Sequence, residues 1–174
     1  FVHGASATPT PLLEALCLRK DLSGVTLYHL HLGGPCQFLD AKYSHQFRSV
    51  SLFSGSSTRA AIEEGRADFV PVFLSDIPEL FSSRQIPLNV VLVQLSPPDR
   101  HGMCTLGTSI DTAKAAVESA DIVIAEINLR MPRTHGNSGV HFSEIDSFIL
   151  SDRPLIEAES AEEGPIEAQI GETI

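Results

Sequence analysis

The sequence predicts an α/β fold, an open, mostly parallel twisted sheet with helices on both faces. Short apolar segments alternate along the chain with segments of helical spacing. Two of the apolar segments, residues 90–95 and 122–127, are near-continuous runs of Val, Ile and Leu. Such runs are typical of parallel strands that are covered on both faces. Repeated strand–helix units in turn favour a parallel sheet with helices on its two sides.

The first elements follow from turn and cap residues. Residues 1–3 can close a first strand, and Thr8 or Thr10 is then expected to cap a helix with a proline in its first turn. Residues 25–30 are strand-like and are followed by a Gly-Gly-Pro turn at residues 33–35.

The middle of the chain repeats this order. Residues 50–53 predict a third strand, and Ser56 or Ser57 is expected to cap the helix that follows it. Residues 69–73 are again short and apolar, and Asp76 is expected to cap a brief helix.

The two buried runs enclose a further helix, and the pattern then changes. Residues 112–120 carry apolar side chains at one-face helical spacing. From about residue 152 the sequence becomes rich in Pro, Glu and Ala. We therefore expect residues 1–151 to form one domain. Residues 152–174 are interpreted as an acidic interdomain linker or the start of a second domain.

Length and charge narrow the class of protein. A chain of 174 residues with 43% hydrophobic residues is long enough to bury one sizeable core. The net charge is −10, and residues 151–174 hold seven of the acids against a single arginine. An acidic protein disfavours nucleic acid and anionic membranes as partners. The acidic run itself is most simply a solvated tail.

The cysteines and the hydropathy pattern favour a reducing compartment inside the cell. Cys17, Cys36 and Cys104 are odd in number and form no C-x-x-C pair, so free thiols in a reducing compartment are expected. No apolar segment approaches the length of a membrane span, and no signal peptide is visible. We expect a soluble intracellular protein, mitochondrial in a eukaryote and cytoplasmic in a bacterium.

The segment S-P-P-D-R-H-G-M-C-T-L-G-T-S-I-D, residues 96–111, is richer in polar and turn residues than a connector needs. It follows a buried strand, and loops at the carboxyl ends of strands are where open α/β sheets bind ligands. Arg100 could hold a carboxylate or phosphate, and His101 with Cys104 could form a nucleophilic pair. The alternative is a surface turn in which Asp99 and Arg100 form an ion pair.

Two other loops carry candidate chemistry. Residues 4–9, G-A-S-A-T-P, join a strand to a helix, so backbone N–H groups could approach an anion or a polarised carbonyl there. Small residues also suit a tight turn, and the G-x-S-x-G pattern of hydrolase nucleophiles is absent. Residues 130–136, with two arginines, a histidine and a glycine, follow the second buried run and could receive anionic groups, or form an ordinary solvent loop.

Metal and nucleotide sites have little support in the sequence. His29 and His31 form an H-x-H pair without an evident third ligand, so we expect ordinary strand histidines and no metal. Neither a G-x-x-x-x-G-K-[ST] nor a G-x-G-x-x-G pattern occurs.

Several segments together resemble one family. The segment at residues 96–111 resembles the corresponding segment of the acetyl-CoA hydrolase/transferase family, which belongs to the class I CoA-transferases and includes the 4-hydroxybutyrate and acetate CoA-transferases. Further similar segments occur in the expected order: G-A-S-A-T-P-T-P, R-A-A-I-E-E-G-R-A-D, F-L-S-D-I-P-E-L-F and M-P-R-T-H-G. The resemblance covers nearly all of residues 1–152. It is to the N-terminal domain alone, because enzymes of this family have two domains.

The resemblance implies a reaction and a missing nucleophile. Class I enzymes move CoA from an acyl-CoA to a small carboxylic acid, such as acetate or 4-hydroxybutyrate, through a glutamyl-CoA intermediate. The family's glutamate lies in the second domain, and Glu126 and Glu144 are not in matching sequence context. We therefore expect no catalytic residue in this chain and little activity from it alone. Hydrolysis results if water intercepts an intermediate.

The resemblance also implies a set of cleft residues and partners. The expected residues of the substrate and CoA cleft are Gly4, Ala5, Ser6, Thr8, Asp99, Arg100, His101, Gly102, Gly107, Thr108, Ser109, Arg133, Thr134, His135 and Gly136. The expected partners are an acyl-CoA, a small carboxylate and the protein's own C-terminal domain, with a homo-oligomer left open. CoA is a substrate here, and no permanently bound cofactor is expected. The alternatives are a noncatalytic acyl-CoA- or carboxylate-binding module, an inactive partial gene product, and a sugar-phosphate isomerase-like enzyme.

Overall fold

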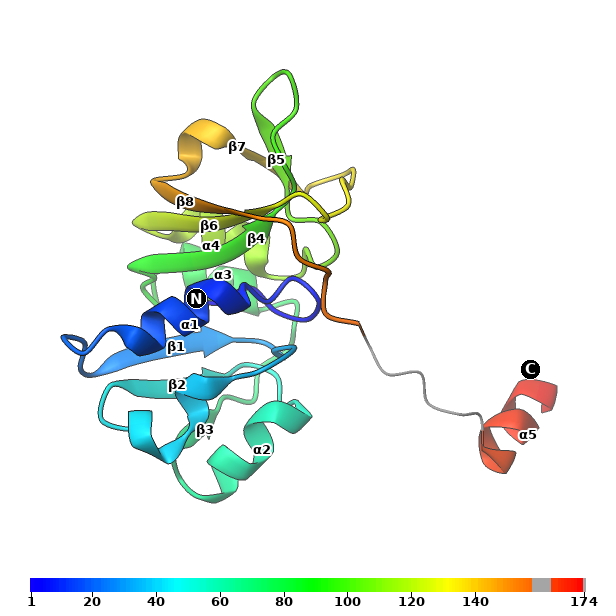
Figure 1. Ribbon diagram of the computed structural model, residues 1–174. Helices are drawn as coiled ribbons and strands as arrows, with labels where there is room; N and C mark the ends of the chain where they lie inside the picture. The colour runs from blue at the N-terminus through cyan, green and yellow to red at the C-terminus, as the bar shows by residue number, and fades with distance from the viewer. Residues whose placement is uncertain (158–163, 174) are drawn as a thin grey trace.

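The computed structural model describes residues 1–157 and 164–173. Its main sheet is parallel, and the N-terminal residues 1–3 lie in its middle (Figure 1). Val2 bridges His29 on one side and Leu92 on the other, and so joins the ladder β3-β2-β1 to the ladder β4-β6-β8. The strands are β1 Val25–His29, β2 Phe47–Ser51, β3 Ala67–Phe69, β4 Val90–Leu95, β6 Ile122–Asn128 and β8 Ser147–Ser151.

Helices cover both faces of this sheet, as the sequence predicted (Figure 1). The α-helices of the body are α1 Thr10–Leu18, α2 Ser56–Glu63, α3 Ile77–Ser82 and α4 Ala113–Ser119. The short 3₁₀ turns are η1 Gln37–Leu39, η2 Ala41–Tyr43 and η3 Phe142–Glu144. Figure 1 shows α1 on one side of the strands and α3 with α4 on the other.

The core consists of two clusters, one on each face. Val91, Val93 and Leu95 of β4 point toward the cluster that contains the buried side chains of α3 and α4. Leu92, between them, points the other way and joins Val2 and the buried leucines of α1. This alternation is the period of two that a strand requires. It explains why the runs at β4 and β6 are apolar on both faces.

The expected caps of the first two helices are wrong, and the expected N-cap of α3 is right in position. The N-cap of α1 is Pro9 and that of α2 is Gly55, and neither helix has a side-chain cap. The Thr8 hydroxyl donates instead to the Ala5 carbonyl, at 2.8 Å, within the preceding loop. Asp76 is the N-cap of α3, but its side chain makes no cap hydrogen bond. Local turns thus compete for the hydroxyls that would otherwise cap a helix.

Two strand boundaries also differ from the prediction. β2 spans Phe47–Ser51 rather than residues 50–53, because its register with β1 begins at the buried Phe47. β3 ends at Phe69, and Phe73 of the expected strand 69–73 is 79% exposed. Apolar composition alone therefore misplaced the ends of the third and fourth strands by two to four residues.

A small antiparallel pair was not predicted. β5 Met103–Thr105 pairs with β7 Gly139–His141 and lies inside the segment interpreted as a single loop. Figure 1 shows the turn before β5 projecting beyond the main sheet.

The C-terminal segment contains a helix, α5 Pro165–Thr173, with no buried residue. It lies in the stretch interpreted as a linker or the start of a second domain, and residues 158–163 of that stretch are outside the described part. Within the described ranges no helix has the length and apolar character needed to cross a membrane.

Candidate functional site

Residues 4–9 form a tightly packed loop at the carboxyl end of the central strand. The Thr8 hydroxyl donates to the Ala5 carbonyl and accepts from the Gly33 N–H at 3.0 Å. A Cβ on Gly4 would lie 2.6 Å from the His31 carbonyl oxygen, so only glycine fits there. Among the described residues, no hydrogen bond involves the N–H or the hydroxyl of Ser6. The N–H and the hydroxyl of Ser6 are thus donors that this loop leaves unoccupied.

Ala5 has a left-handed backbone, with φ of +51°. This region is unfavourable for a residue with a Cβ, and such residues persist where the surroundings fix them. Its N–H donates to the His31 carbonyl at 2.9 Å, and it bridges Leu32. The neighbouring loop after β1 therefore holds Ala5 in this conformation.

A buried polar network lies beneath this loop, at the ends of β4 and β6. Gln94, Glu126 and Asn128 are fully buried, and Gln94 is the register partner of Glu126. Asn128 Nδ2 donates to Gln94 Oε1 at 2.9 Å. Gln94 Nε2 donates to the Thr8 carbonyl at 3.3 Å. The network connects two strands directly to the loop above them.

Arg153 completes the network from the segment that follows β8. Its Nε donates to Glu126 Oε1 at 2.7 Å, and its Nη2 to Glu126 Oε2 at 2.9 Å. Nη2 also donates to the Thr8 carbonyl at 2.9 Å. The side chain of Glu126 is fully buried and that of Arg153 is 21% exposed, so this is a largely desolvated pair. The Ser151 hydroxyl also donates to Glu126 Oε1, at 2.6 Å.

His3 connects the loop 4–9 to the loop 96–111. Its Nδ1 accepts from the Gln94 N–H at 3.3 Å, so its Nε2 carries the proton and donates to the Ser109 carbonyl at 2.5 Å. Burial lowers the pKa of this histidine, against the opposing effect of its backbone hydrogen bonds and of Asp111. A neutral imidazole therefore joins the two loops.

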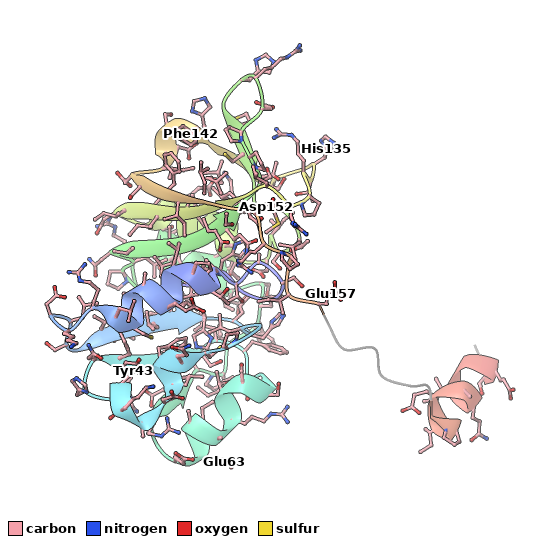
Figure 2. The ribbon with its side chains drawn as sticks, viewed as in Figure 1. Tyr43, Glu63, His135, Phe142, Asp152 and Glu157 are labelled. Atoms are coloured by element: carbon pink, nitrogen blue, oxygen red, sulfur yellow. The ribbon has the colours of Figure 1, made fainter. Side chains whose placement is uncertain are left out.

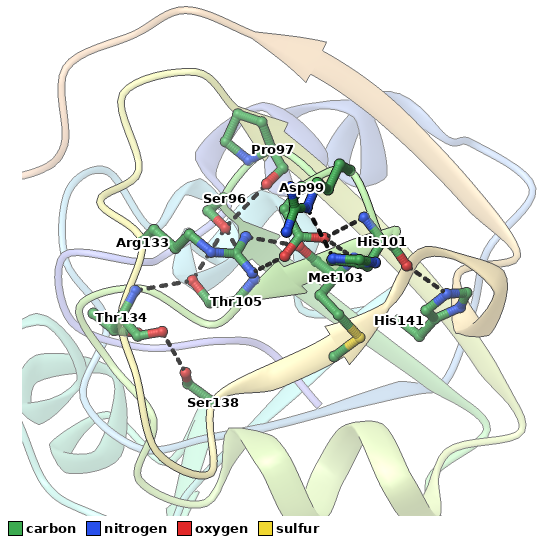
Figure 3. A network of polar contacts seen from close by, with 11 residues as sticks. Ser96, Pro97, Asp99, His101, Met103, Thr105, Arg133, Thr134, Ser138 and His141 are labelled. Carbon is green, nitrogen blue, oxygen red and sulfur yellow. Dashed lines mark hydrogen bonds and ion pairs between the residues drawn. The ribbon is translucent and has the colours of Figure 1, made fainter.

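Asp99 organises the turn before β5. Its Oδ1 accepts from the N–H groups of His101 and Met103, at 2.8 and 3.0 Å, and its Oδ2 accepts from Arg133 Nη2 at 2.8 Å (Figure 3). The hydrogen bonds from the Met103 and His101 amides, aided by the charge of Arg133, hold the pKa of this carboxyl below its usual range.

The loops 96–111 and 129–138 are joined by several contacts. Arg133 Nη1 donates to the Met103 carbonyl at 2.7 Å, and the Thr134 hydroxyl donates to the Gly107 carbonyl at 3.1 Å. A Cβ on Gly107, whose φ is +65°, would collide with Met131 Sδ. The two loops that the sequence singled out separately are therefore one packed unit.

The remaining predicted cleft residues differ in exposure. Arg100 and His101 are exposed at the turn, where Arg100 Nε donates to His101 Nε2 at 2.9 Å. Thr108, His135 and Gly136 are also exposed, and Figure 2 shows His135 on the outside of its loop. Gly102 packs against the His141 ring. The structure does not gather all fifteen predicted residues at one point, and their contact with substrate remains a prediction.

The alternative chemistries find little support. Cys104 is fully buried, and burial raises the pKa of its thiol to about 11, so it is a poor nucleophile beside the exposed His101. His29 is buried, with Nδ1 donating to the Leu30 carbonyl and Nε2 accepting from the Ser49 hydroxyl at 2.7 Å. His31 instead contacts the Phe53 ring. No group of three metal-ligating side chains occurs within the described ranges.

The sequence of this domain is similar to known proteins over almost its whole length. The sequence model of the acetyl-CoA hydrolase/transferase N-terminal domain matches residues 4–157. The chain belongs to this family. It is 40% identical over 177 residues to a succinyl-CoA:acetate/propanoyl-CoA:succinate CoA transferase of Fasciola hepatica. It is also 40% identical over 173 residues to a 4-hydroxybutyrate coenzyme A transferase of Clostridium kluyveri. The alignments cover 100% and 99% of this chain but only 37% and 40% of those enzymes.

Solved structures agree with the family assignment. RipA from Yersinia pestis superposes with a TM-score of 0.87 at 27% identity, over 94% of this chain and 41% of RipA. The 4-hydroxybutyrate CoA-transferase of Porphyromonas gingivalis superposes with a TM-score of 0.67 at 28% identity, over 90% of this chain and 36% of that one. The chain thus spans about two fifths of these relatives and has the fold of a CoA-transferase domain.

Sequence reasoning missed several buried residues of the candidate site of this acetyl-CoA hydrolase/transferase domain. His3, Gln94, Asn128 and Arg153 were not selected, and Glu126 was noted only as an acid out of context. One signal was available: Gln94, Glu126 and Asn128 are the polar residues near the ends of two otherwise apolar strands. A polar side chain in a strand buried on both faces needs a partner, which marks it for a role.

A hollow lies at the opposite end of the sheet, at the amino ends of its strands. Its volume is about 640 Å³, and its lining is mostly apolar, including Phe1, Leu16, Val25 and Val90. These residues surround the amino ends of β1 and β4. In the described part of the chain the convergent polar donors are instead at the carboxyl ends, where folds of this type bind ligands. We therefore take the carboxyl ends of the strands as the candidate active site of the family domain.

Proposed function

We propose that this chain is the N-terminal part of a CoA-transferase that moves CoA between an acyl-CoA thioester and a small carboxylic acid such as acetate or 4-hydroxybutyrate. Residues 1–151 would form one wall of the active site. Residues 152–174 would lead into, or begin, the protein's own second domain. The relatives' names, which include CoA transferases for acetate and 4-hydroxybutyrate, support this substrate class.

One observation carries the proposal that the nucleophile lies outside this chain: the acids near the candidate loops already have partners. Glu126 is buried and paired with Arg153. Glu144 Oε1 accepts from the His141 N–H at 3.0 Å, and Asp99 accepts three hydrogen bonds. Asp111 Oδ1 accepts from the Ala113 N–H at 3.1 Å. A carboxylate that must attack a thioester has to be free to approach it.

The proposed reaction proceeds through covalent intermediates on a glutamate of the second domain. Its carboxylate attacks the thioester carbonyl, the C–S bond breaks, and an acyl–glutamyl anhydride and CoA thiolate form. The thiolate attacks the glutamyl carbonyl and releases the first carboxylate, leaving a glutamyl-CoA thioester. The acceptor carboxylate then attacks this thioester and expels the CoA thiolate. The thiolate attacks the acyl carbon of the new anhydride, which releases the new acyl-CoA and frees the glutamate carboxylate.

The loop 4–9 would supply donors for these steps. Each tetrahedral intermediate carries a negative oxygen, which fixed N–H groups stabilise better than water does. Ser6, whose N–H and hydroxyl have no partner in the described part of the chain, is the residue we propose for this contact. The other cleft residues are proposed to bind the acid or CoA.

The proposal is tested by trapping the intermediate. A longer protein that contains the second domain is incubated with acetyl-CoA, and its intact mass is compared with that of residues 1–174 treated alike. We expect the longer protein to gain a CoA adduct on a glutamate beyond residue 174 and to transfer CoA to acetate. Residues 1–174 should gain no adduct and show no turnover. An adduct on any residue of this chain would contradict the proposal, and acyl-CoA binding without turnover in the longer protein would favour a binding module.

A further inference from the structure

Residues 152–156, which we name the exit segment, cross the carboxyl end of the sheet. Figure 1 shows this segment (orange) running from β8 past the loop 4–9 (blue). Asn128 Nδ2 donates to the Arg153 carbonyl at 3.0 Å. Ile156 lies over Gly33 and Gly34, where an added Cβ would come within 3.2 Å of its side chain. The exit segment therefore contacts the end of β6 on one side and the loop after β1 on the other.

Its strongest contact is made by Arg153 with two acceptors at once. The guanidinium binds both oxygens of Glu126, and Nη2 also donates to the Thr8 carbonyl. Thr8 is itself fully buried and, with Gly33, closes the loop. The partners Arg153 and Thr8 are 145 residues apart in the sequence, so this contact fixes the loop relative to β6 and to the exit segment.

Packing alone does not explain why β6 carries a charged residue, Glu126, in its buried part. Glu126 is fully buried between strands whose neighbouring side chains are mostly apolar, and a buried carboxylate is costly unless it is paired. A planar guanidinium binds a carboxylate through two parallel hydrogen bonds, which fixes its orientation. Here that orientation leaves one N–H directed at the Thr8 carbonyl, which also accepts from Gln94.

We propose that Glu126 and Arg153 are positioning residues. Glu126 orients the Arg153 guanidinium, and Arg153 holds the Thr8 carbonyl, so that the Ser6 donors stand where the reacting oxygen develops charge. This inference rests on the proposed function. Neither side chain touches substrate; each acts through the loop.

The test uses the longer protein and a matched pair of variants. Glu126→Gln removes the carboxylate partner of Arg153. Asp21→Asn removes the carboxylate partner of Arg19, a pair joined by two hydrogen bonds that is more than half exposed and makes no contact with Thr8. The measurements are kcat, KM and the amide hydrogen exchange of the peptide that covers residues 4–9.

We expect Glu126→Gln to lower kcat roughly tenfold to a hundredfold with little change in KM, because displaced donors affect the transition state more than binding. Exchange in residues 4–9 should accelerate, while that in β4 and β6 stays as in the wild type. Asp21→Asn should match the wild type in all three measurements. A wild-type kcat in Glu126→Gln, or exchange that rises equally across the whole sheet, would overturn the proposal.

Arg153→Lys is the second variant, in case Glu126→Gln does not fold. Lysine keeps the charge beside Glu126, but a single ammonium replaces a planar fork that binds both Glu126 oxygens and the Thr8 carbonyl. We expect a smaller loss of kcat and the same local rise in exchange at residues 4–9. Wild-type exchange in that peptide would overturn the proposal. Because exchange does not depend on turnover, this readout separates failure of the positioning role from failure of the proposed CoA transfer.

Discussion

At the scale of single residues, burial and hydrogen-bond partners give polar side chains specific protonation states. His29 is fully buried, and its two ring nitrogens bind the Leu30 carbonyl and the Ser49 hydroxyl. Burial lowers its pKa from 6.5 to about 4. Both partners suit the neutral ring, since a carbonyl needs a donor and a hydroxyl can donate to the unprotonated nitrogen. A proton added to His29 would therefore reverse the hydrogen bond to Ser49 and place a charge in the buried contact between β1 and β2.

This lowered pKa predicts a pH dependence of stability. The unfolded chain binds the His29 proton near pH 6.5 and the folded chain only near pH 4. The contribution of the neutral His29 to the free energy of unfolding is therefore complete above pH 6.5. This contribution is lost as the pH falls from 6.5 to about 4, and the loss reaches about 3 kcal/mol. Denaturant unfolding of the wild type and His29→Gln at several pH values measures it.

The stability difference between the two proteins should change between pH 6.5 and pH 4 and be flat above. His135→Gln, at an exposed position, should keep the wild-type dependence. Parallel curves for the wild type and His29→Gln would contradict this account.

At the scale of elements, the loops 96–111 and 129–138 are stabilised mainly by each other. Arg133 binds Asp99 and the Met103 carbonyl, so the turn before β5 depends on a side chain about thirty residues away. Figure 3 shows these contacts. It also shows the Thr134 N–H donating to the Thr105 hydroxyl, which in turn donates to the Ser96 hydroxyl. Short strands such as β5 and β7 need such support.

We predict that Arg133→Ala lowers kcat/KM of the longer protein by something on the order of tenfold to a thousandfold, as the loss of charge-assisted contacts in a site would. Arg84→Ala is the control, because the Arg84–Asp121 pair is 3.0 Å long, exposed, and of a kind that contributes about 0–1 kcal/mol. Arg66 also forms a surface ion pair, with Glu64, but it is a poorer control because it donates to the Leu39 carbonyl as well. Equal kinetics in Arg133→Ala and the wild type would make these loops ordinary surface.

At the scale of the whole molecule, one edge of the sheet is exposed and apolar. In the described part of the chain, β8 pairs with β6 on one side only. Its Phe148, Ile149 and Leu150 are 45%, 37% and 71% exposed, and Leu129 nearby is 62% exposed. An exposed edge strand with apolar side chains readily pairs with another chain.

We therefore predict that residues 1–174 alone self-associate through this edge. Sedimentation at several concentrations should show the effect, and Leu150→Asp should reduce it. Leu18→Asp is a matched control, because Leu18 is 79% exposed on α1, away from this edge. Self-association that is equal in both variants would place the contact elsewhere, and a monomeric wild type would contradict the prediction.

The elements and the family were determined by the sequence itself. Hydrophobic period and composition are local properties, so the buried runs at β4 and β6, the helix between them and the α/β class were predictable. The family segments at residues 4–11 and 96–111 indicated the acetyl-CoA hydrolase/transferase assignment. Strand ends and helix caps were less predictable, because pairing register and local turns decide them.

Only the tertiary structure decided how the site is assembled. Residues 1–3 occupy the centre of the sheet because both β1 and β4 accept them as a partner. Arg133 meets Asp99, and Arg153 meets both Glu126 and Thr8, across separations of 34, 27 and 145 residues. No local pattern encodes such contacts, since they depend on strand order and on the path of the exit segment. The sequence thus identified the loops, and the fold determined which buried side chains hold them in place.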